Sequence, residues 1–315
     1  MRDAISHYAG LLFIILVIPT VADEQDVLIV RDTADPARLV TGNVDVSVTP
    51  PGFALPNRVF VAELTEAFPG IDDLRGDEGF FAISDASELP QGYTTLDGGV
   101  DVRFNLLTFA LGCRSANLWV WTDPVDTGDE GYADDVEFEP VEPPISLSYT
   151  KTPSSFFKAT VDGSDEDISG FVIDRTSAAG GLHKHLSILL DDDDTSTSTP
   201  IPAGIYVVAM TVGHDPDGGG PMSDVFFEVF NAGLGRNGDA AASAAAAFFA
   251  ELVRFGPMAG DLDGNRIVNL DDYAWFVDCT TGAKAGPVAD NCACADFDRD
   301  DDVDLIDFGK IQGFF

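Results

Sequence analysis

Two acidic stretches near the end of the chain, residues 261–272 and 296–307, have the spacing of calcium-binding loops. A twelve-residue calcium loop takes side-chain oxygens from positions 1, 3, 5, 9 and 12 and a backbone carbonyl from position 7. Both stretches supply this pattern, so the sequence predicts two Ca²⁺ sites. The predicted ligands are Asp261, Asp263, Asn265, the carbonyl of Ile267, Asn269 and Asp272 in the first loop, and Asp296, Asp298, Asp300, the carbonyl of Asp302, Asp304 and Asp307 in the second.

Position 6 of the two loops is occupied by Arg266 and Asp301, where such loops usually have glycine. This position needs a left-handed backbone, which glycine adopts freely, aspartate tolerates and arginine resists. All side-chain donors of the second loop are carboxylates, whereas the first loop includes two amides. We therefore expect the second loop to bind Ca²⁺ more tightly than the first.

Two histidines, His183 and His185, are spaced so that they share one face of a strand. Two imidazoles on one face could begin a site for Zn²⁺ or Cu²⁺, with His214 or a carboxylate as the third ligand. The alternative is a pair of hydrogen-bonded histidines with no metal.

Sequence patterns typical of catalysis are lacking. The chain has no G-x-S-x-G elbow, no glycine-rich phosphate loop and no H-E-x-x-H sequence. The 54 acidic residues single out no pair for glycoside hydrolysis. Trp119 and Trp121 alternate along an expected strand and could stack on a sugar, or they could pack in the core. We expect a protein that is not an enzyme.

The charge of the chain restricts its partners. With a net charge of −37 and a pI of about 4.1, the chain repels phosphate backbones and anionic membrane surfaces. Cations are its natural partners, and nucleic acid is excluded. A hydrophobic content of 45% is that of a globular protein.

The N-terminus has the features of a signal peptide over residues 1–22. Arg2 precedes an apolar run at 11–18, and the small residues Thr20 and Ala22 follow it. No later segment is apolar over about 18 residues, so we expect no membrane span in the mature chain. We predict a secreted, periplasmic or cell-surface protein.

Four cysteines, Cys113, Cys279, Cys292 and Cys294, suit an oxidising compartment. A disulfide from Cys279 to Cys292 or Cys294 would cross-link the region of the two loops. The sequence leaves three connectivities open. A zinc site at Cys292 and Cys294 is a further alternative, although no histidine lies nearby.

Short apolar or alternating runs, separated by Gly, Pro, Asn and Asp, fill the chain between residues 23 and 235. They predict a mainly β fold, a β-sandwich made of one large unit or of two packed halves with a boundary near 140–145. The expected strands are 27–30, 44–48, 58–62, 100–104, 118–121, 145–149, 170–173, 186–190, 204–210 and 225–230.

An alanine-rich stretch at 236–257 predicts one connecting helix, because alanine is the best helix former. Asn237 or Asp239 would cap it, and Gly256 would end it. Its stripe of Phe248, Phe249, Leu252 and Val253 is expected to pack on the sandwich.

Residues 258–315 form a tandem repeat in which each loop opens a helix. The apolar positions Leu270, Tyr273 and Phe276 recur as Leu305, Phe308 and Ile311, and position 8 is Val268 and Val303, which could pair across a short β contact. We expect the final Phe314 and Phe315 to join the packed helical face.

With Asp at position 12 and loop–helix units, this repeat resembles a type I dockerin, and especially the dockerin-like tails of secreted proteins of planctomycete-type bacteria. The resemblance implies a small α module that binds calcium and docks onto a cohesin-like or cell-surface protein. The family's recognition positions fall on Leu270 and Asp271 and on Leu305 and Ile306, where cellulosomal dockerins have a Ser/Thr pair.

The β region resembles, over residues 26–235, a PEP-CTERM-type family of exported bacterial proteins that has zinc-regulated members and no established function. The sequences at 170–173, 181–186, 203–210 and 223–230 carry this likeness. The family's sorting tail is replaced here by the dockerin-like module.

Three functional hypotheses follow. The leading one is a secreted, non-enzymatic calcium-binding protein that is tethered or assembled through its module. The second is a polysaccharide-degrading or carbohydrate-binding protein docked by the module, with a glycoside hydrolase-type activity if it is an enzyme. The third is an extracellular zinc- or copper-binding protein that uses His183 and His185.

Overall fold

Strands are more abundant than helices in the computed structural model, which describes residues 26–45, 52–66, 73–122, 124, 136–151, 156–192, 201–214, 220–235, 238–285 and 287–314. The predicted signal peptide, Asn237 and Phe315 lie outside the described residues. The mainly β prediction is confirmed. No described helix is long and apolar enough to cross a membrane.

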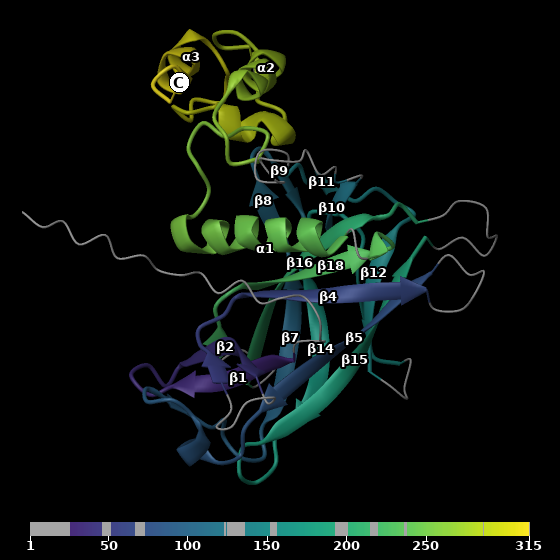
Figure 1. The fold of residues 1–315 in the computed structure, drawn as a ribbon. Helices are drawn as coiled ribbons and strands as arrows, with labels where there is room; N and C mark the ends of the chain where they lie inside the picture. Colours follow the sequence, from purple (N-terminus) through teal and green to yellow (C-terminus); the bar gives the residue numbers. More distant parts are fainter. Residues whose placement is uncertain are drawn as a thin grey trace, which may run out of the picture.

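Along the chain the strands come first and the α-helices last (Figure 1). The strands are β1 (Val27–Asp32), β2 (Arg38–Asp45), β3 (Gly52–Ala54), β4 (Val59–Glu66), β5 (Leu74–Ala82), β6 (Tyr93–Thr94), β7 (Asp101–Leu107), β8 (Phe109–Leu111), β9 (Arg114–Ala116), β10 (Trp119–Thr122), β11 (Glu139–Pro140), β12 (Ser146–Thr150), β13 (Lys158–Val161), β14 (Ile168–Arg175), β15 (Leu182–Asp191), β16 (Gly204–His214), β17 (Met222–Ser223) and β18 (Phe226–Ala232). The helices are the 3₁₀ turns η1 (Ala86–Glu88) and η3 (Asp290–Ala295) and the α-helices α1 (Gly238–Phe255), α2 (Leu270–Cys279) and α3 (Leu305–Ile311).

Among the described residues, sixteen of the strands pair into one large mixed sheet, and β8 and β9 form a separate hairpin. The path runs β13-β12-β15-β5-β4-β18-β16-β17-β2-β1-β6, and β1 also pairs in parallel with β5. That last pairing links two distant parts of the path, so the sheet folds back on itself around a core. Strands from both sides of residues 140–145 belong to this sheet.

Strands β16 and β18 are buried along their whole length, which explains their continuous apolar sequences. Residues on one face, including Tyr206 and Phe230, belong to the main core. Residues on the other face, including Val207 and Phe227, pack against α1 (Figure 1). Each of these strands therefore lies between two apolar layers.

The connecting helix is confirmed as α1, and its predicted stripe packs on the sheet: Phe248 and Phe249 are buried, and Leu252 and Val253 lie against the same cluster. Trp119 and Trp121 are buried in this second core, at 0% and 4% exposure. Both side chains pack in the core, and neither offers a platform for a sugar.

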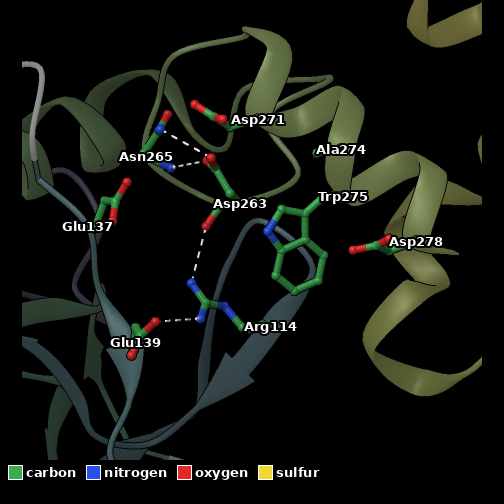
Figure 2. A pocket seen from close by; sticks show the side chains of 9 residues that line it. All are labelled: Arg114, Glu137, Glu139, Asp263, Asn265, Asp271, Ala274, Trp275 and Asp278. Atoms are coloured by element: carbon green, nitrogen blue, oxygen red, sulfur yellow. Dashed lines mark hydrogen bonds and ion pairs between the residues drawn. The ribbon is translucent and has the colours of Figure 1, made fainter.

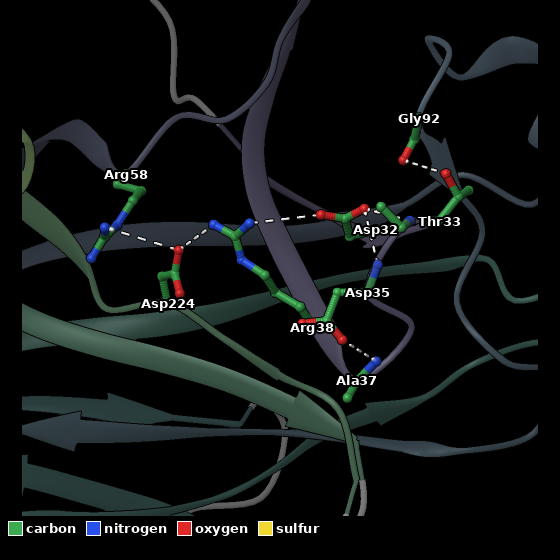
Figure 3. A network of polar contacts seen from close by, with 9 residues as sticks. Asp32, Thr33, Asp35, Ala37, Arg38, Arg58, Gly92 and Asp224 are labelled. Carbon is green, nitrogen blue, oxygen red and sulfur yellow. Dashed lines mark hydrogen bonds and ion pairs between the residues drawn. The ribbon is translucent and has the colours of Figure 1, made fainter.

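An arginine network ties β2 to the segments that precede β4 and β18 (Figure 3). Arg38 donates to Asp224 at 2.6 Å and lies 3.6 Å from Asp32, and Arg58 lies 4.0 Å from the same Asp224. The hydrogen bond and charge of Asp224 raise the pKa of Arg38, whereas burial lowers the pKa of Arg58. We assign this network a structural role.

A carboxyl group is enclosed in the main core. Glu228 of β18 is 1% exposed and accepts a short hydrogen bond from the hydroxyl of Tyr149. Its other oxygen, Oε1, is buried without a hydrogen-bond partner. Loss of solvation on burial raises the pKa of Glu228 from 4.5 to about 7, against the opposing effect of the Tyr149 hydrogen bond.

Glu228→Gln is expected to make the folded chain more stable at pH 8 and to change little at pH 4.5. The pKa is higher in the folded chain, so the stability from this group is full below about pH 4.5 and is lost as the pH rises through about 7. The shift corresponds to roughly 3 kcal/mol. Urea unfolding at a series of pH values measures the difference. Glu63→Gln, at an exposed position of β4, is the control. If the unfolding free energies of wild type and Glu228→Gln differed by the same amount at all pH values, the account would be contradicted.

Candidate metal centre

The C-terminal module has its own small core, to which α2, α3 and η3 contribute. Phe276 of α2 and Ile311 of α3 are buried in it together with Leu262, Ala295 and Val303. The module lies at one end of the molecule, next to α1 and to the β8–β9 hairpin (Figure 1). Each of its two α-helices begins directly from one of the acidic loops.

The structure brings three carboxylates of each loop together. In the first loop, Asp261, Asp263 and Asp272 each place an oxygen within 4.8 Å of the others. In the second loop, Asp296, Asp298 and Asp307 do the same. These residues hold positions 1, 3 and 12 of the predicted calcium loops. Convergence of such oxygens is the arrangement that a hard divalent cation requires.

The residue at position 12 organises each loop from within. Asp272 is fully buried, and its Oδ1 accepts from the backbone N–H of Leu262 at 2.6 Å and of Asp263 at 3.3 Å. In the second loop, Asp307 is equally buried and accepts from the N–H groups of Phe297 and Asp298 at 2.7 and 3.1 Å. The two loops therefore share one backbone design.

The other loop positions repeat as well. Asp261 accepts from the N–H groups of Gly264 and Arg266, and Asp296 accepts from those of Arg299 and Asp301. Residues at position 9 are the N-caps of the helices. Asn269 and Asp304 each form a capping box with the aspartate at position 12. One aspartate thus anchors both its loop and the helix that follows.

Position 6 has the left-handed backbone that the sequence predicts, with φ of 67° at Arg266 and 70° at Asp301. For arginine this conformation costs about 1–2 kcal/mol. The side chain of Arg266 binds back to α1: it donates to the carbonyl of Gly256 at 3.2 Å and lies 3.7 Å from Glu251 and over the ring of Phe248. These contacts with α1 offset the strain and explain an arginine at this position.

The electrostatics of the loops favour a cation. Burial raises the pKa of Asp261, and burial with the neighbouring carboxylates raises the pKa of Asp263 to about 6. In the second loop, Oδ1 of Asp298 and Oδ1 of Asp302 are buried without hydrogen-bond partners. A bound cation would relieve the repulsion in one loop and satisfy the free oxygens in the other.

The remaining predicted donors lie around these carboxylates. Asn265 contacts Asp263 through its amide, 3.2 Å from Oδ2, and its Oδ1 accepts from the N–H of Ile267. Asp300 accepts from the N–H of Asp302. The carboxylates of Asp302 and Asp304 also approach Asp307 within 4.8 Å. The loop pattern predicts only a carbonyl ligand at position 7, so it does not indicate the carboxylate of Asp302 as a nearby acidic group.

Two packing predictions for the module are wrong. Val303 does not pair with Val268: its carbonyl accepts from the N–H groups of Thr281 and Gly282, because the chain leaving α2 lies beside it. Leu270 and Leu305 are not on the packed face but are 76% and 81% exposed, because each is the first residue of its helix. Phe314 is 42% exposed and lies against the ring of Phe297.

Disulfides cross-link the module both internally and to the β region. Cys279 pairs with Cys292, one of the two predicted partners, and Cys113 pairs with Cys294. The alternative of a zinc site at Cys292 and Cys294 is wrong, since both sulfurs are used in disulfides. Cys113 follows β8, so a β hairpin is covalently joined to the module.

The first loop contacts this hairpin directly (Figure 2). The N–H of Cys113 donates to the carbonyl of Leu262 at 2.9 Å. Arg114 points its guanidinium toward the carbonyl of Asp263, at 3.5 Å, and over the ring of Trp275, while it donates to the carbonyl of Phe138. A cleft of about 400 Å³ lies at this junction. Arg114 cannot be singled out from sequence, because only the fold brings β9 to the loop.

The two predicted histidines lie together on the surface of β15, with Nε2 atoms 3.0 Å apart. His214 is wrong as their third ligand. It is buried near the end of β16, with Nδ1 3.5 Å from Arg31, and burial lowers its pKa. The alternative prediction, a carboxylate, agrees with the structure, since Asp26 joins the two histidines. Asp26 lies far away in sequence, which is why it was not named.

Comparison with protein families, with curated proteins and with solved structures finds no match to this chain.

Proposed function

We propose that this is an exported, non-enzymatic calcium-binding protein whose C-terminal module binds two Ca²⁺ ions. The observation that carries the proposal is the double convergence of carboxylates at positions 1, 3 and 12 of the two loops. The two loops also have the same hydrogen bonds to the aspartate at position 12, the same helix caps and the same left-handed backbone at position 6. Acidic residues that cluster by chance would not repeat these features.

The residues present fit Ca²⁺ better than a softer metal. Both sets consist of carboxylate, amide and carbonyl oxygens, which calcium prefers, and each loop offers enough of them for six to eight ligands once water is included. When bound, Ca²⁺ supplies the positive charge that the loops lack. Asp272 in the first loop and Asp307 in the second then hold the loop backbone and the N-cap residue of the following helix in place.

Calcium bound to the first loop is expected to act on the β region as well, because this loop contacts the β8–β9 hairpin and α1. Leu262 and Asp263 offer carbonyls to Cys113 and Arg114, and Arg266 contacts Glu251 and Phe248 of α1. A loop held in one conformation presents these groups in fixed positions. We infer that calcium fastens the module onto the β region, and that the Cys113–Cys294 disulfide keeps it nearby.

The dockerin-like resemblance adds that the module tethers or assembles the chain extracellularly on a cohesin-like or cell-surface protein. Such a partner would cover Leu270, Leu305 and Ile306, which are exposed at the starts of the two helices. The rival hypothesis, a polysaccharide-degrading or carbohydrate-binding protein, loses its one candidate platform, because Trp119 and Trp121 are buried. Secretion and tethering stay predictions.

Titration calorimetry is expected to count two Ca²⁺ ions per chain, the tighter one in the second loop. Asp296→Ala removes a position 1 ligand and should abolish the tighter step, while Asp261→Ala should abolish the weaker one. Asp278→Asn on the exposed side of α2 is the control and should keep both. Fewer than one ion per wild-type chain, or two ions in both alanine variants, would contradict the proposal.

A further inference from the structure

A second group of metal-ligand side chains lies on the large sheet, far along the chain from the calcium loops. It is centred on β5, which pairs with β1 on one side and with β15 on the other. His185 is opposite Gly79, and His183 is opposite Phe81. Asp26 directly precedes Val27, whose partner on β5 is Phe80. The parallel register therefore places Asp26 beside Gly79, in one row with His185.

The three side chains converge at distances that suit one metal ion. Nε2 of His183 is 3.0 Å from Nε2 of His185 and 3.3 Å from Oδ2 of Asp26. Two nitrogen ligands of a tetrahedral Zn²⁺ at about 2.0–2.1 Å are themselves about 3.3 Å apart. The ligand atoms thus have nearly the separations that coordination to a single ion would give them.

Gly79 makes room for the third ligand. A Cβ atom at this position would lie 1.8 Å from Oδ1 of Asp26, a distance that no two such atoms can share. Any other residue at position 79 would force the Asp26 carboxylate away from the histidines. The glycine in the middle of β5 therefore has a local reason, although glycine weakens a strand.

His185 also has a second carboxylate behind it. Its Nδ1 is 3.3 Å from Oδ2 of Asp77, which lies two residues before Gly79 on the same face of β5. Nδ1 is buried and is not aligned for a hydrogen bond in this conformation. A carboxylate beside the outer nitrogen of a histidine is the usual support of a metal-bound imidazole. The rings of His183 and Phe81 are nearly perpendicular, with their centroids 5.6 Å apart.

A metal-free pair of histidines explains less of this geometry. One proton shared between the two Nε2 atoms accounts for their contact, and the charge of the protonated pair accounts for the approach of Asp26, but no metal-free arrangement needs all three ligand atoms at the separations of a coordination shell. We propose that Asp26, His183 and His185 bind one divalent transition-metal ion of the zinc class, with Asp77 positioning His185. Two imidazoles and one carboxylate suit Zn²⁺, and Ca²⁺, which takes oxygen ligands, does not compete for this site.

The site is open to solvent. The side chains of His183 and His185 are 58% and 38% exposed, and that of Asp26 is 27% exposed. Three protein ligands leave a fourth position of a tetrahedral ion for water or for another molecule. The ion can therefore exchange with the medium, as a protein that captures zinc outside the cell requires.

The test uses the full, disulfide-bonded chain, freed of metal and then saturated with Ca²⁺ so that the acidic loops are filled. Equilibrium dialysis against Zn²⁺, with bound zinc counted by mass spectrometry, is expected to give one tight ion per chain. The double variant His183→Ala, His185→Ala should lower the zinc affinity at least 100-fold. Asp26→Asn should lower it at least tenfold, and Asp77→Asn by roughly 10–100-fold.

Gly79→Ala is the sharpest variant, because it keeps all three ligands and displaces only the carboxylate of Asp26. It is expected to lower zinc affinity about as much as Asp26→Asn does, whereas Glu63→Gln on the exposed face of β4 should leave it unchanged. Circular dichroism checks that each variant is folded. Equal zinc binding by wild type and by the folded double-histidine variant would overturn the proposal, as would a wild-type chain that binds no tight zinc under calcium. Both outcomes leave the proposed calcium function untouched.

Discussion

Chelating calcium is expected to lower the melting temperature of the full chain by on the order of 10 °C. A ligand that binds only the folded state at 1,000 times its dissociation constant stabilises that state by about 4 kcal/mol per site. Each kcal/mol shifts the melting temperature by about 2–4 °C for 150–250 residues and by less for a chain of 315 residues, so the two sites together give a shift of this size. In the calcium-free chain the convergent carboxylates repel one another, and buried oxygens such as Oδ1 of Asp298 lack partners.

Scanning calorimetry with excess calcium and with excess chelator measures this effect. The double variant Asp261→Asn, Asp296→Asn removes one carboxylate from each loop, and we expect its melting temperature to respond little to the chelator. Asp278→Asn should respond as the wild type does, because Asp278 lies outside both loops. A wild-type chain with the same melting temperature in both buffers would show that calcium does not stabilise the fold.

Breaking the Cys113–Cys294 disulfide is expected to cost about 5 kcal/mol of unfolding free energy. The two cysteines are 181 residues apart, so the bond removes much of the freedom of the unfolded chain, and the chain-entropy model gives a loss of this size. The double variant Cys113→Ser, Cys294→Ser tests it by guanidinium unfolding at a fixed calcium concentration. The module should also become more accessible to proteases, since its covalent link to the β8–β9 hairpin is gone.

The second disulfide provides the matched control. Cys279 and Cys292 are only 13 residues apart, so Cys279→Ser, Cys292→Ser should cost about 3 kcal/mol in the same model. The order of the two losses is the informative result. If loss of Cys279–Cys292 lowered the unfolding free energy more than loss of Cys113–Cys294, the disulfide between the module and the β region would stabilise the chain less than the model predicts.

The sequence was most informative where side-chain chemistry follows a fixed spacing. The calcium loops were predicted because positions 1, 3 and 12 depend on residues close together in the chain, and the structure brings those carboxylates together. Strands such as β7 and β16 were predicted from alternating or continuous apolar residues, and α1 from its alanines.

Features that depend on contacts between residues far apart in the sequence could not be predicted. Strand β5 was not predicted, because its sequence includes Asp77 and two glycines, which are residue types that are rare in strands. Those glycines are explained only by neighbours that the fold supplies: Leu64 lies against Gly76, and Asp26 lies against Gly79. For the same reason the third ligand of the histidine pair could not be named, and the partner of Cys113 could not be chosen.

The exposed positions of Leu270 and Leu305 show a different limit. Spacing by three along a helix places residues on one face, but it does not say where the packed face begins. Each leucine opens its helix beside a capping box, ahead of the first residue that reaches the small core. The apolar pattern is correct at Phe276, Phe308 and Ile311, which lie in or against the small core, and it fails at the two leucines, where the helices begin.

The most direct measurement is a crystal structure of the full chain grown with calcium, with anomalous difference maps collected at a long X-ray wavelength. The account predicts two peaks, one about 2.3–2.6 Å from the carboxylates of Asp261, Asp263 and Asp272 and one at the same distance from those of Asp296, Asp298 and Asp307. A map with no peak at either loop, at calcium concentrations that saturate ordinary extracellular sites, would contradict it.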